Sequence, residues 1–387
     1  MAQALGTVIV GGSVAAVTAA DELRRLGYDE PIVLVGDEAH APYTRPPLSK
    51  GVLAGTDSAE SITLPAFGDD VELRLGTRAN GVDLDRRHIM LDDGDQVPFD
   101  SLLIATGARA RTLLAEDRSR EHVLRTLDDC LALRDELVGK TPSVLVIGAG
   151  FLGLEFASTC RSLGLDTTVV DIAPPLVRQL GPFLSEIIVA AAIDAGLRLR
   201  DSPGGVRPLE AGDGRISGVA LDDGTRIEAD LVVTAIGCRP NIEWLADSGL
   251  NLTGGVVVDH LCRAAPAVTA AGDVAAWANN SEQKVRRTPH YMHAVDHARS
   301  AASTIVHGDD ASPYRSMPYF WTDLFDLTVK ICGALPLIGE PGIIQGSLQD
   351  RDAILGWGEQ GSPVAAATIN HRLPLRKLRR LAGMWQS

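Results

Sequence analysis

The sequence predicts an α/β fold in which two successive units of mainly parallel sheet are followed by a smaller α+β domain. Three observations support this. Two apolar, strand-like runs each end in a glycine-rich turn that opens a helix-like stretch, at 7–16 and 144–153. Each of these segments is followed by an Asp-Asp-Gly turn and a second apolar strand, so the same arrangement occurs twice in the chain. Beyond about residue 313, short strands alternate with turns instead.

The two glycine-rich turns differ in how completely they match a dinucleotide-binding pattern. In such a turn the first Gly permits a tight bend, the second lets the backbone approach a pyrophosphate, and the third lets the helix pack on the strand. The free N–H groups of the helix N-terminus then face the phosphate. The second turn has all three glycines, Gly148, Gly150 and Gly153, whereas the first keeps Gly11 but has Ser13 and Ala16 at the other positions.

An acidic residue ends the second strand of each unit. Asp37 follows the apolar run 31–36, and Asp171 follows 167–170. An acid at this position binds a ribose hydroxyl in Rossmann-like domains, and Asp171 favours NADH because its carboxylate would repel the 2′-phosphate of NADPH. A single glycine-rich turn is weak evidence for a nucleotide-binding site. Two units that each have a strand, a turn, a helix, a second strand and an acidic residue in this order indicate two dinucleotides, between which a hydride or electrons pass.

The later features also repeat. An Asp-led apolar strand ending in Gly occurs at 100–107 and again at 230–237, and each is preceded by an Asp-Asp-Gly turn, at 92–94 and 222–224. Because Asp-Gly is a strong hairpin signal, each strand is expected to follow a short hairpin. The sequence therefore predicts an internal duplication of a nucleotide-binding domain.

Composition limits the function classes. A chain of 387 residues has room for two or three domains. The net charge of −14 argues against a nucleic-acid-binding protein. No apolar run approaches the roughly 20 residues of a membrane span, and a strand begins too early for a signal peptide. We expect a cytoplasmic enzyme that contacts neither nucleic acid nor membrane.

The cysteines and histidines point away from redox-active thiols and metals. No two of the five cysteines are close in sequence, and no C-x-x-C motif occurs, which excludes a dithiol relay and argues against an iron–sulfur or zinc site. His293 and His297 are four residues apart and His290 precedes them, but no acidic or Cys cluster accompanies them. We therefore expect no metal site.

Eight strings, taken in order, resemble a known family. They are Gly11–Ala15, Arg45–Lys50, Ala105–Gly107, Leu124–Leu127, Gly148–Glu155, Gly237–Asn241, Gly272–Val274 and Phe320–Asp323. Together they resemble the FAD-dependent, NAD(P)H-dependent ferredoxin reductases that serve Rieske oxygenases and haem monooxygenases, which belong to the glutathione-reductase-like flavoproteins. The resemblance covers nearly the whole chain. Its most specific parts are the R-P-P-L-S-K and G-x-G-x-x-G-x-E strings.

The resemblance implies three domains. These are a discontinuous FAD-binding domain formed by 1–109 and 240–312, an NAD-binding domain at 110–239, and a C-terminal α+β domain at 313–387 that covers the flavin.

The resemblance also implies site residues. Those implied for FAD are Gly11, Ser13, Ala15, Asp37, Arg45, Lys50, Ala79, Ala105, Thr106, Gly107, Arg125, Asp273, Tyr291 and Trp321. Those implied for NAD are Gly148, Gly150, Gly153, Glu155, Asp171 and Gly237. Lys50 and Glu155 are implied to meet beside the flavin ring as the catalytic pair.

The chemistry of an electron-rich flavin fits that pair. A fixed cation at Lys50 would stabilise the charge that develops on hydride arrival, and Glu155 would hold the lysine and orient the carboxamide of NADH. Without the resemblance, Lys50 reads as a solvated surface lysine, Glu155 as a first-turn helix acid and Asp273 as a turn aspartate.

Three positions depart from the family pattern. Pro289 and Tyr291 stand where the family usually has Glu and Trp, and Leu324 stands in place of Gln. These positions bear on the flavin potential, on charge-transfer behaviour with NADH and on partner choice.

The predicted function is electron transfer from NADH through FAD to a small iron–sulfur ferredoxin that feeds an oxygenase. One alternative is an NADH oxidase-type flavoenzyme, although the Pro-rich loop 41–50 lacks the Cys that peroxidase or disulfide reductase activity needs. The prolines of this loop are expected to stiffen it and to exclude helix. Another is an FAD/NADH-binding redox sensor without a ferredoxin partner.

A basic segment near the C-terminus has two readings. It forms either an amphipathic helix with a solvated basic face or part of a docking patch for an acidic ferredoxin. The residues of the predicted docking patch are Lys284, Arg286, Arg287, Arg376, Lys377, Arg379 and Arg380.

Overall fold

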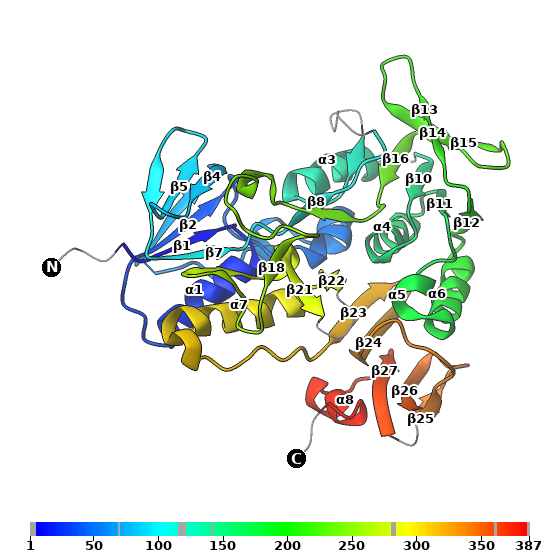
Figure 1. Ribbon diagram of the computed structural model, residues 1–387. Helices are drawn as coiled ribbons and strands as arrows, with labels where there is room; N and C mark the ends of the chain where they lie inside the picture. The colour runs from blue at the N-terminus through cyan, green and yellow to red at the C-terminus, as the bar shows by residue number, and fades with distance from the viewer. Residues whose placement is uncertain are drawn as a thin grey trace. The chain divides into compact units, whose positions relative to one another are not determined.

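A computed structural model describes residues 5–68, 70–114, 121–140, 142–279, 284–359 and 362–384. The chain forms two compact units, each assembled from separated segments. The first unit consists of 1–44, 62–109 and 239–316. The second consists of 45–61, 110–238 and 317–387. Figure 1 shows the elements of both units by their labels.

The first unit is built on a six-stranded sheet with the order β19-β20-β7-β1-β2-β3. Strand β1 (Thr7–Val10) is fully buried and pairs in parallel with β2 (Ile32–Gly36) and β7 (Ser101–Ile104). Near-continuous apolar sequence is what a parallel strand buried on both faces requires. The helices α1 (Val14–Arg25) and α7 (Tyr291–His307) pack against each other beside this sheet (Figure 1).

Smaller elements complete the first unit. A three-stranded antiparallel sheet has the order β4-β5-β6. A mixed three-stranded sheet has the order β18-β21-β22, in which β18 and β21 are parallel and β22 is antiparallel to β21. The remaining bounds are β3 (Val71–Leu75), β4 (Ala79–Asp83), β5 (His88–Leu91), β6 (Gln96–Pro98), β8 (Ala108–Ala110), η4 (Glu243–Leu245), β18 (Val256–Val258), β19 (Arg263–Ala265), β20 (Val268–Ala270), η5 (Gly272–Val274), β21 (Ala275–Asn279), β22 (Lys284–Arg286) and η6 (Gly308–Asp310).

The second unit repeats the central topology of the first. Strand β10 (Val144–Ile147) pairs in parallel with β11 (Thr167–Asp171) and β16 (Leu231–Thr234), as β1 does with β2 and β7. An antiparallel β13-β14-β15 sheet takes the place of β4-β5-β6. The α/β fold and the internal duplication predicted from the sequence are thus confirmed.

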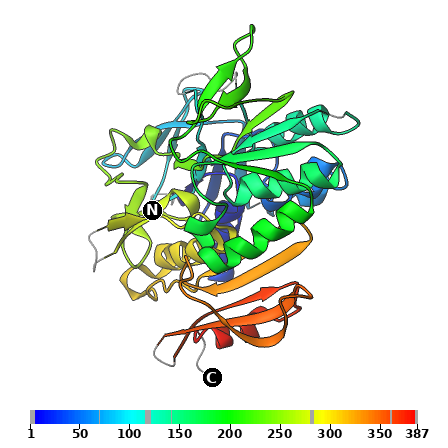
Figure 2. The same cartoon turned by 90° about the vertical axis from the view of Figure 1, so that its right-hand side faces the viewer.

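The second unit also contains a five-stranded antiparallel sheet with the order β23-β24-β27-β26-β25, drawn in orange to red in Figure 2. Helix α8 (Leu375–Leu381) packs on β27 and β24 of this sheet. The remaining bounds are β9 (His122–Val123), α3 (Leu127–Leu137), α4 (Phe151–Ser162), α5 (Val177–Leu180), α6 (Pro182–Asp194), β12 (Arg198–Asp201), β13 (Arg207–Glu210), β14 (Ile216–Ala220), β15 (Arg226–Glu228), β23 (Tyr319–Leu324), β24 (Leu327–Gly333), β25 (Gly342–Ser347), β26 (Asp352–Glu359) and β27 (Ser362–Ile369). Strands β8 and β17 (Cys238–Pro240) each have residues in both units.

One expectation about the Pro-rich loop is wrong. Its prolines were expected to exclude helix, yet residues 46–49 form the 3₁₀ helix η1 (Pro46–Ser49), which continues into α2 (Gly51–Ala54). Both prolines stand in the first turn of η1, where the N–H that proline lacks has no helical partner in any case. The prolines therefore start a helical segment, and Lys50 lies at its junction with the next.

The compact units group the segments by contact. Residues 317–387 belong to the same unit as 110–238, and so do residues 45–61 of the Pro-rich region. The assignment of FAD and NAD to separate sequence domains, with boundaries at 109, 239 and 312, stays a prediction.

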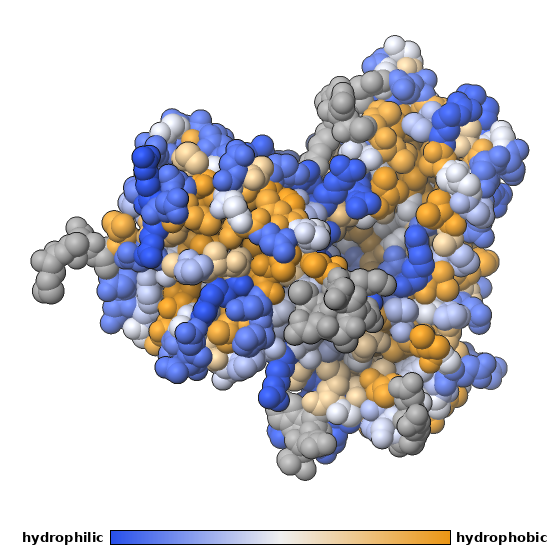
Figure 3. Space-filling model, viewed as in Figure 1, coloured by the Kyte–Doolittle hydropathy of each residue, from blue (hydrophilic) through white to orange (hydrophobic). Residues whose placement is uncertain are grey.

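No helix among the described residues is long and apolar enough to cross a membrane. On the face shown in Figure 3, hydrophilic and hydrophobic residues are interspersed.

Substitution of Gly153 by Ala is expected to destabilise the second unit. An added Cβ would lie 2.0 Å from the carbonyl oxygen of Gly148, which is backbone and has little freedom to retreat. Overpacking of this kind costs about 1–3 kcal/mol. Gly212→Ala is the matched control, because an added Cβ there meets nothing within 4 Å. Urea unfolding should separate the two variants, and equal unfolding free energies would contradict the tight packing at Gly153.

Candidate functional site

The glycine turn of the second unit combines two packed positions with one open position. A Cβ on Gly148 would lie 2.4 Å from the carbonyl oxygen of Ala235, and Gly148 has a φ of +110°. Gly153 is equally confined, whereas a Cβ on Gly150 would find its nearest neighbour 3.7 Å away, at Gln179 Nε2. The protein's own packing thus requires the outer glycines, and the middle one leaves an open backbone surface. That surface fits a dinucleotide pyrophosphate at the N-terminus of α4.

Asp171 lies over the same turn. It is the last residue of β11, its Oδ2 accepts the N–H of Ala149 at 2.6 Å, and its Oδ1 accepts the N–H of Ile172 at 2.6 Å. The Arg178 guanidinium lies 3.5 Å from Oδ1. Two backbone donors hold the carboxylate in place, so its negative charge is fixed beside the turn.

The corresponding turn of the first unit has the same architecture with fewer glycines. Gly11 has a φ of +134°, and a Cβ there would lie 2.1 Å from the carbonyl oxygen of Ala105. Ser13 is the N-cap of α1, but its side chain makes no capping hydrogen bond, so it does not compete for the first-turn N–H groups. Ala15 packs where Gly272 approaches the helix, 3.3 Å from the position of a Cβ on that glycine. Ser13 can therefore replace glycine without closing an anion site.

Asp37 follows β2 directly and is exposed, with Arg78 Nη2 at 3.8 Å from its Oδ2. It lies one residue beyond the position that matches Asp171, because Val10 pairs with Val35 as Ile147 pairs with Val170. Ala79, the next residue after Arg78, is buried at the start of β4.

The strand end at 105–107 is fastened to a distant segment of the same unit. Thr106 Oγ1 donates to the carbonyl of Asn241 at 2.8 Å, and Asn241 Nδ2 donates to the carbonyl of Thr106 at 2.9 Å. The N–H of Asn241 also reaches the carbonyl of Gly107 at 3.0 Å. Three hydrogen bonds therefore fix the backbone at the carboxyl end of β7.

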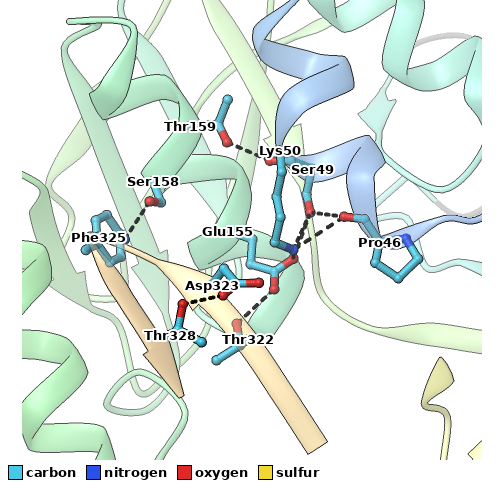
Figure 4. A network of polar contacts seen from close by, with 10 residues as sticks. All are labelled: Pro46, Ser49, Lys50, Glu155, Ser158, Thr159, Thr322, Asp323, Phe325 and Thr328. Atoms are coloured by element: carbon cyan, nitrogen blue, oxygen red, sulfur yellow. Dashed lines mark hydrogen bonds and ion pairs between the residues drawn. The ribbon is translucent and has the colours of Figure 1, made fainter. Parts of the chain in front are cut away.

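Lys50 and Glu155 form an ion pair within the second unit, with 2.6 Å between Lys50 Nζ and Glu155 Oε2 (Figure 4). The lysine side chain is 25% exposed and the glutamate side chain 12%. Lys50 Nζ also donates to the carbonyl of Pro46 at 3.3 Å. The resemblance implied that these two side chains approach each other, and the structure brings them together.

Two hydroxyls that the sequence interpretation did not single out complete this group. Ser49 Oγ donates to Glu155 Oε2 at 2.7 Å, and Thr322 Oγ1 donates to Glu155 Oε1 at 2.8 Å (Figure 4). Both lie inside strings that carried the family resemblance, which is the only sequence signal that could have pointed to them. Lys50 and Ser158 also line a cavity of about 400 Å³, together with residues 323–328.

The position of Glu155 on its helix corrects one sequence interpretation. Glu155 was read as a first-turn acid, but it is the fifth residue of α4, and the first turn of α4 contains no acidic residue. The helix dipole falls off within one turn, so the carboxylate relies on Lys50 and the two hydroxyls instead.

The other predicted site residues of the second unit lie on separate elements. Arg45 precedes η1, and its Nη1 donates to the carbonyl of Arg125 at 2.7 Å. Trp321 lies on β23 and stacks on Tyr319 with 5.9 Å between ring centroids. Gly237 lies just beyond β16, and its carbonyl accepts the N–H of Arg111.

In the first unit, Asp273 lies in η5 and Tyr291 begins α7. His290 is the N-cap of α7, because its side chain accepts the N–H of Met292 at 3.3 Å. This capping role was not predicted. Burial lowers the pKa of His290 to about 4, and the nearby Asp273 opposes that shift only in part. The imidazole is therefore neutral at pH 7, as a hydrogen-bond-accepting cap must be.

His293 and His297 belong to an aromatic cluster. His297 Nε2 accepts the indole N–H of Trp277 at 2.9 Å, and His293 Nδ1 pairs with the Tyr314 hydroxyl at 2.9 Å. Burial lowers the pKa of His293 to about 4 and that of His297 to about 2. Among the described residues, no group of three His, Cys, Asp or Glu side chains is arranged to hold a metal ion.

The basic residues predicted to dock a partner lie on two elements, described separately. Lys284 and Arg286 lie on β22, and Arg287 follows them, with its Nη1 donating to the carbonyl of Asp273 at 2.8 Å. Helix α8 carries four cations around a single fully buried residue, Leu378. Of these, Arg376, Lys377 and Arg380 are exposed, while Arg379 is half-buried.

Four of the five cysteines are buried. Burial raises the pKa of Cys130 and Cys332 to about 11, and that of Cys160 and Cys262 to about 12. Cys238 is half-buried. Thiols held protonated in this way are poor nucleophiles.

Native protein treated with an alkylating reagent at pH 8 should therefore react on Cys238 at most, whereas urea-unfolded protein should react on all five cysteines. Peptide mass mapping of the labelled protein provides the measurement. Fast labelling of two or more thiols in the folded state would contradict the burial described here.

The sequence matches the family described as pyridine nucleotide-disulphide oxidoreductase over residues 6–301. Rhodocoxin reductase of Rhodococcus erythropolis is 36% identical over 352 residues, which cover 89% of this chain and 81% of that protein. The ferredoxin–NAD(+) reductase component of the anthranilate 1,2-dioxygenase system of Burkholderia cepacia is 34% identical over 388 residues, with 97% and 93% coverage.

Solved structures agree with these relatives. The reductase in the covalent putidaredoxin reductase–putidaredoxin complex superposes with a TM-score of 0.85 at 30% identity, covering 98% of this chain and 92% of that one. An NAD-dependent persulfide reductase from A. fulgidus shares the fold alone, with a TM-score of 0.81 at 21% identity. The resemblance drawn from the sequence strings and the predicted fold class are confirmed.

Proposed function

This chain belongs to the pyridine nucleotide-disulphide oxidoreductase family, and we propose that it passes electrons from NADH through FAD to an iron–sulfur ferredoxin that feeds an oxygenase. It is an oxidoreductase, and FAD and NADH are its cofactor and co-substrate. Its cytoplasmic location stays a prediction.

The observation that carries the proposal is the arrangement on helix α4. The N-terminus of α4 presents the open Gly150 turn, and Glu155, one turn further along, holds the Lys50 ammonium at 2.6 Å. The same helix thus offers a phosphate site and, beyond it, a partly buried ion pair. A nicotinamide dinucleotide needs both features, since its pyrophosphate must be anchored while its reactive ring reaches a preorganised charge.

Each unit contributes its own proposed ligands. In the first unit we assign FAD to Gly11, Ser13, Ala15, Asp37, Ala79, Ala105, Thr106, Gly107, Asp273 and Tyr291. In the second unit we assign FAD to Arg45, Lys50, Arg125 and Trp321, and NADH to Gly148, Gly150, Gly153, Glu155, Asp171 and Gly237.

Bound FAD would supply the redox chemistry, because a flavin can accept one hydride, which carries two electrons, from NADH and release those electrons one at a time. Lys50 supplies a fixed positive charge for that step, and Glu155 keeps the ammonium from turning into solvent. Because the pair is only partly exposed, its field is less screened than that of a surface pair. No residue of the pair needs to act as a nucleophile.

The buried cysteines separate this proposal from thiol chemistry. Disulfide and peroxide reduction require a reactive thiol. The segment 41–50 has no cysteine, and four of the five cysteines lie in the interior. We therefore propose one-electron delivery to a metal cluster on a partner protein, in line with the named partners of the relatives.

The partner is proposed to be acidic. Although the chain has a net charge of −14, α8 concentrates four cations within seven residues, and Lys284, Arg286 and Arg287 form a second basic group. Local positive charge on an acidic protein steers an acidic ferredoxin and raises its association rate.

Anaerobic mixing of the FAD-loaded protein with NADH and an acidic [2Fe–2S] ferredoxin tests the function. We expect reduction of the ferredoxin cluster within the turnover time and no reduction of glutathione disulfide. A separate experiment tests the proposed docking surface. The double variant Arg376→Glu with Lys377→Glu should slow ferredoxin reduction about tenfold at low salt.

That double variant should leave NADH-driven flavin reduction unchanged. The control with the same change in net charge is the double variant Arg207→Glu with Arg226→Glu, at two exposed arginines on β13 and β15. Disulfide turnover without ferredoxin reduction would overturn the function. Equal losses in the α8 variant and in this control would overturn the docking surface alone.

Asp171→Asn is expected to weaken discrimination between NADH and NADPH. The substitution keeps an acceptor for the Ala149 N–H but removes the charge that would repel a 2′-phosphate, while Arg178 remains nearby. We expect the ratio of flavin reduction rates with NADH and NADPH to fall at least about tenfold, or about 1.4 kcal/mol. Asp37→Asn, which changes the acid that follows β2 in the first unit, should leave that ratio unchanged. An unchanged ratio in Asp171→Asn would refute the role of this carboxylate.

A further inference from the structure

Strand β23 runs along helix α4 in a register that matches their repeats. The ring of Phe320 packs on that of Phe151 with 4.0 Å between centroids, and Thr322 donates to Glu155. Two residues along a strand span about 6.6 Å, and four along a helix span about 6.0 Å. Alternate residues of β23 therefore meet helix residues that are four apart, and Thr322 comes opposite Glu155.

The turn that follows β23 fixes this register. The N–H of Phe325 donates to Ser158 Oγ at 2.7 Å, which continues the same stripe along α4 (Figure 4). Phe325 and Asp326 have φ values of +48° and +58°. Non-glycine residues hold this conformation only when the surroundings impose it. A slip of one residue in β23 would therefore break both the turn and the contact to Glu155.

Thr322 and Lys50 divide the two oxygens of the Glu155 carboxylate. Oε1 accepts the Thr322 hydroxyl, while Oε2 accepts Ser49 and contacts Lys50. The terminal torsion of a glutamate is broad, so a carboxylate with partners on one oxygen alone can rotate. Partners on both oxygens fix its plane. Thr322 is 0% exposed, so water cannot take the place of its hydroxyl.

We propose that Thr322 is a positioning residue for hydride transfer, because it fixes the plane of the Glu155 carboxylate and thereby the position of the Lys50 ammonium. This inference rests on the proposed function for its kinetic consequence. It also assigns a task to the C-terminal sheet, which supplies Thr322 from a strand 167 residues away from Glu155 in the sequence.

The test uses Thr322→Val, which keeps the shape and removes the hydroxyl. Thr322→Ser restores the hydroxyl, and Thr368→Val is the control, since Thr368 is a buried threonine of the same sheet whose Oγ1 has no hydrogen-bond partner. Each variant is also made with Glu155→Met, which has no oxygen to accept the Thr322 hydroxyl, to complete a double-mutant cycle. Two readouts follow, the urea unfolding midpoint of the protein and the limiting rate of flavin reduction by NADH under anaerobic single-turnover conditions.

We expect Thr322→Val to lower the limiting rate about tenfold, with the half-saturating NADH concentration changed less than the rate. Thr322→Ser should recover most of the rate, and Thr368→Val should match the wild type. In the Glu155→Met background, which lacks the acceptor, the additional effect of Thr322→Val on both readouts should largely disappear.

A Thr322→Val loss of equal size in both backgrounds would overturn the inference, because Thr322 would then act without Glu155. A coupled change in the unfolding midpoint with an unchanged rate would also overturn it, by reducing the contact to a structural one. Failure of the wild-type protein to be reduced by NADH would instead refute the proposed function, and the positioning role with it, whatever the midpoints show.

Discussion

The ion pair between Lys50 and Glu155 is the interaction on which the site in the second unit depends. It is assembled from three distant segments, namely the helical turn η1, helix α4 and strand β23. Partly burying two charges costs solvation, and the attraction between them offsets that cost only with good geometry and further hydrogen bonds. The Pro46 carbonyl and the hydroxyls of Ser49 and Thr322 supply those bonds. The segments η1, α4 and β23 therefore together hold the Lys50 ammonium in a fixed position.

Helix α4 connects that charge to nucleotide binding. Gly148 and Gly153 are dictated by the contact of strand and helix, which also sets where the helix begins and hence where Glu155 lies. The phosphate turn and the ion pair are thus rigidly linked through the first five residues of α4. In the first unit the order of strand, turn and helix is kept with Ser13 and Ala16 in place of two glycines, and the close approach at Gly11 is retained. The two units thus share the strand–turn–helix motif, and in the second unit the helix also carries Glu155, which pairs with Lys50.

Much of this was predictable because it is local in the sequence. A buried apolar strand, a glycine turn and a terminal acid lie within about thirty residues of one another in a βαβ unit, so their spacing carries the geometry. The contact between Thr322 and Glu155 has no such local signal, since it depends on the register of β23 against α4. The helical start at Pro46 and Pro47 was missed because proline was read as a helix breaker, although it is tolerated in a first turn. His290 was considered as a metal ligand, but in the structure its side chain accepts the Met292 N–H and caps helix α7.

The central claim, that the second unit presents NADH to a flavin through a fixed charge, is tested most directly by anaerobic rapid mixing of the FAD-loaded wild-type protein with NADH and, separately, with NADPH. The visible flavin absorption band reports the reaction. The account predicts fast bleaching by NADH and much slower bleaching by NADPH, because the Asp171 carboxylate opposes a 2′-phosphate. Absence of bleaching by NADH, or failure of the protein to retain flavin, would contradict it.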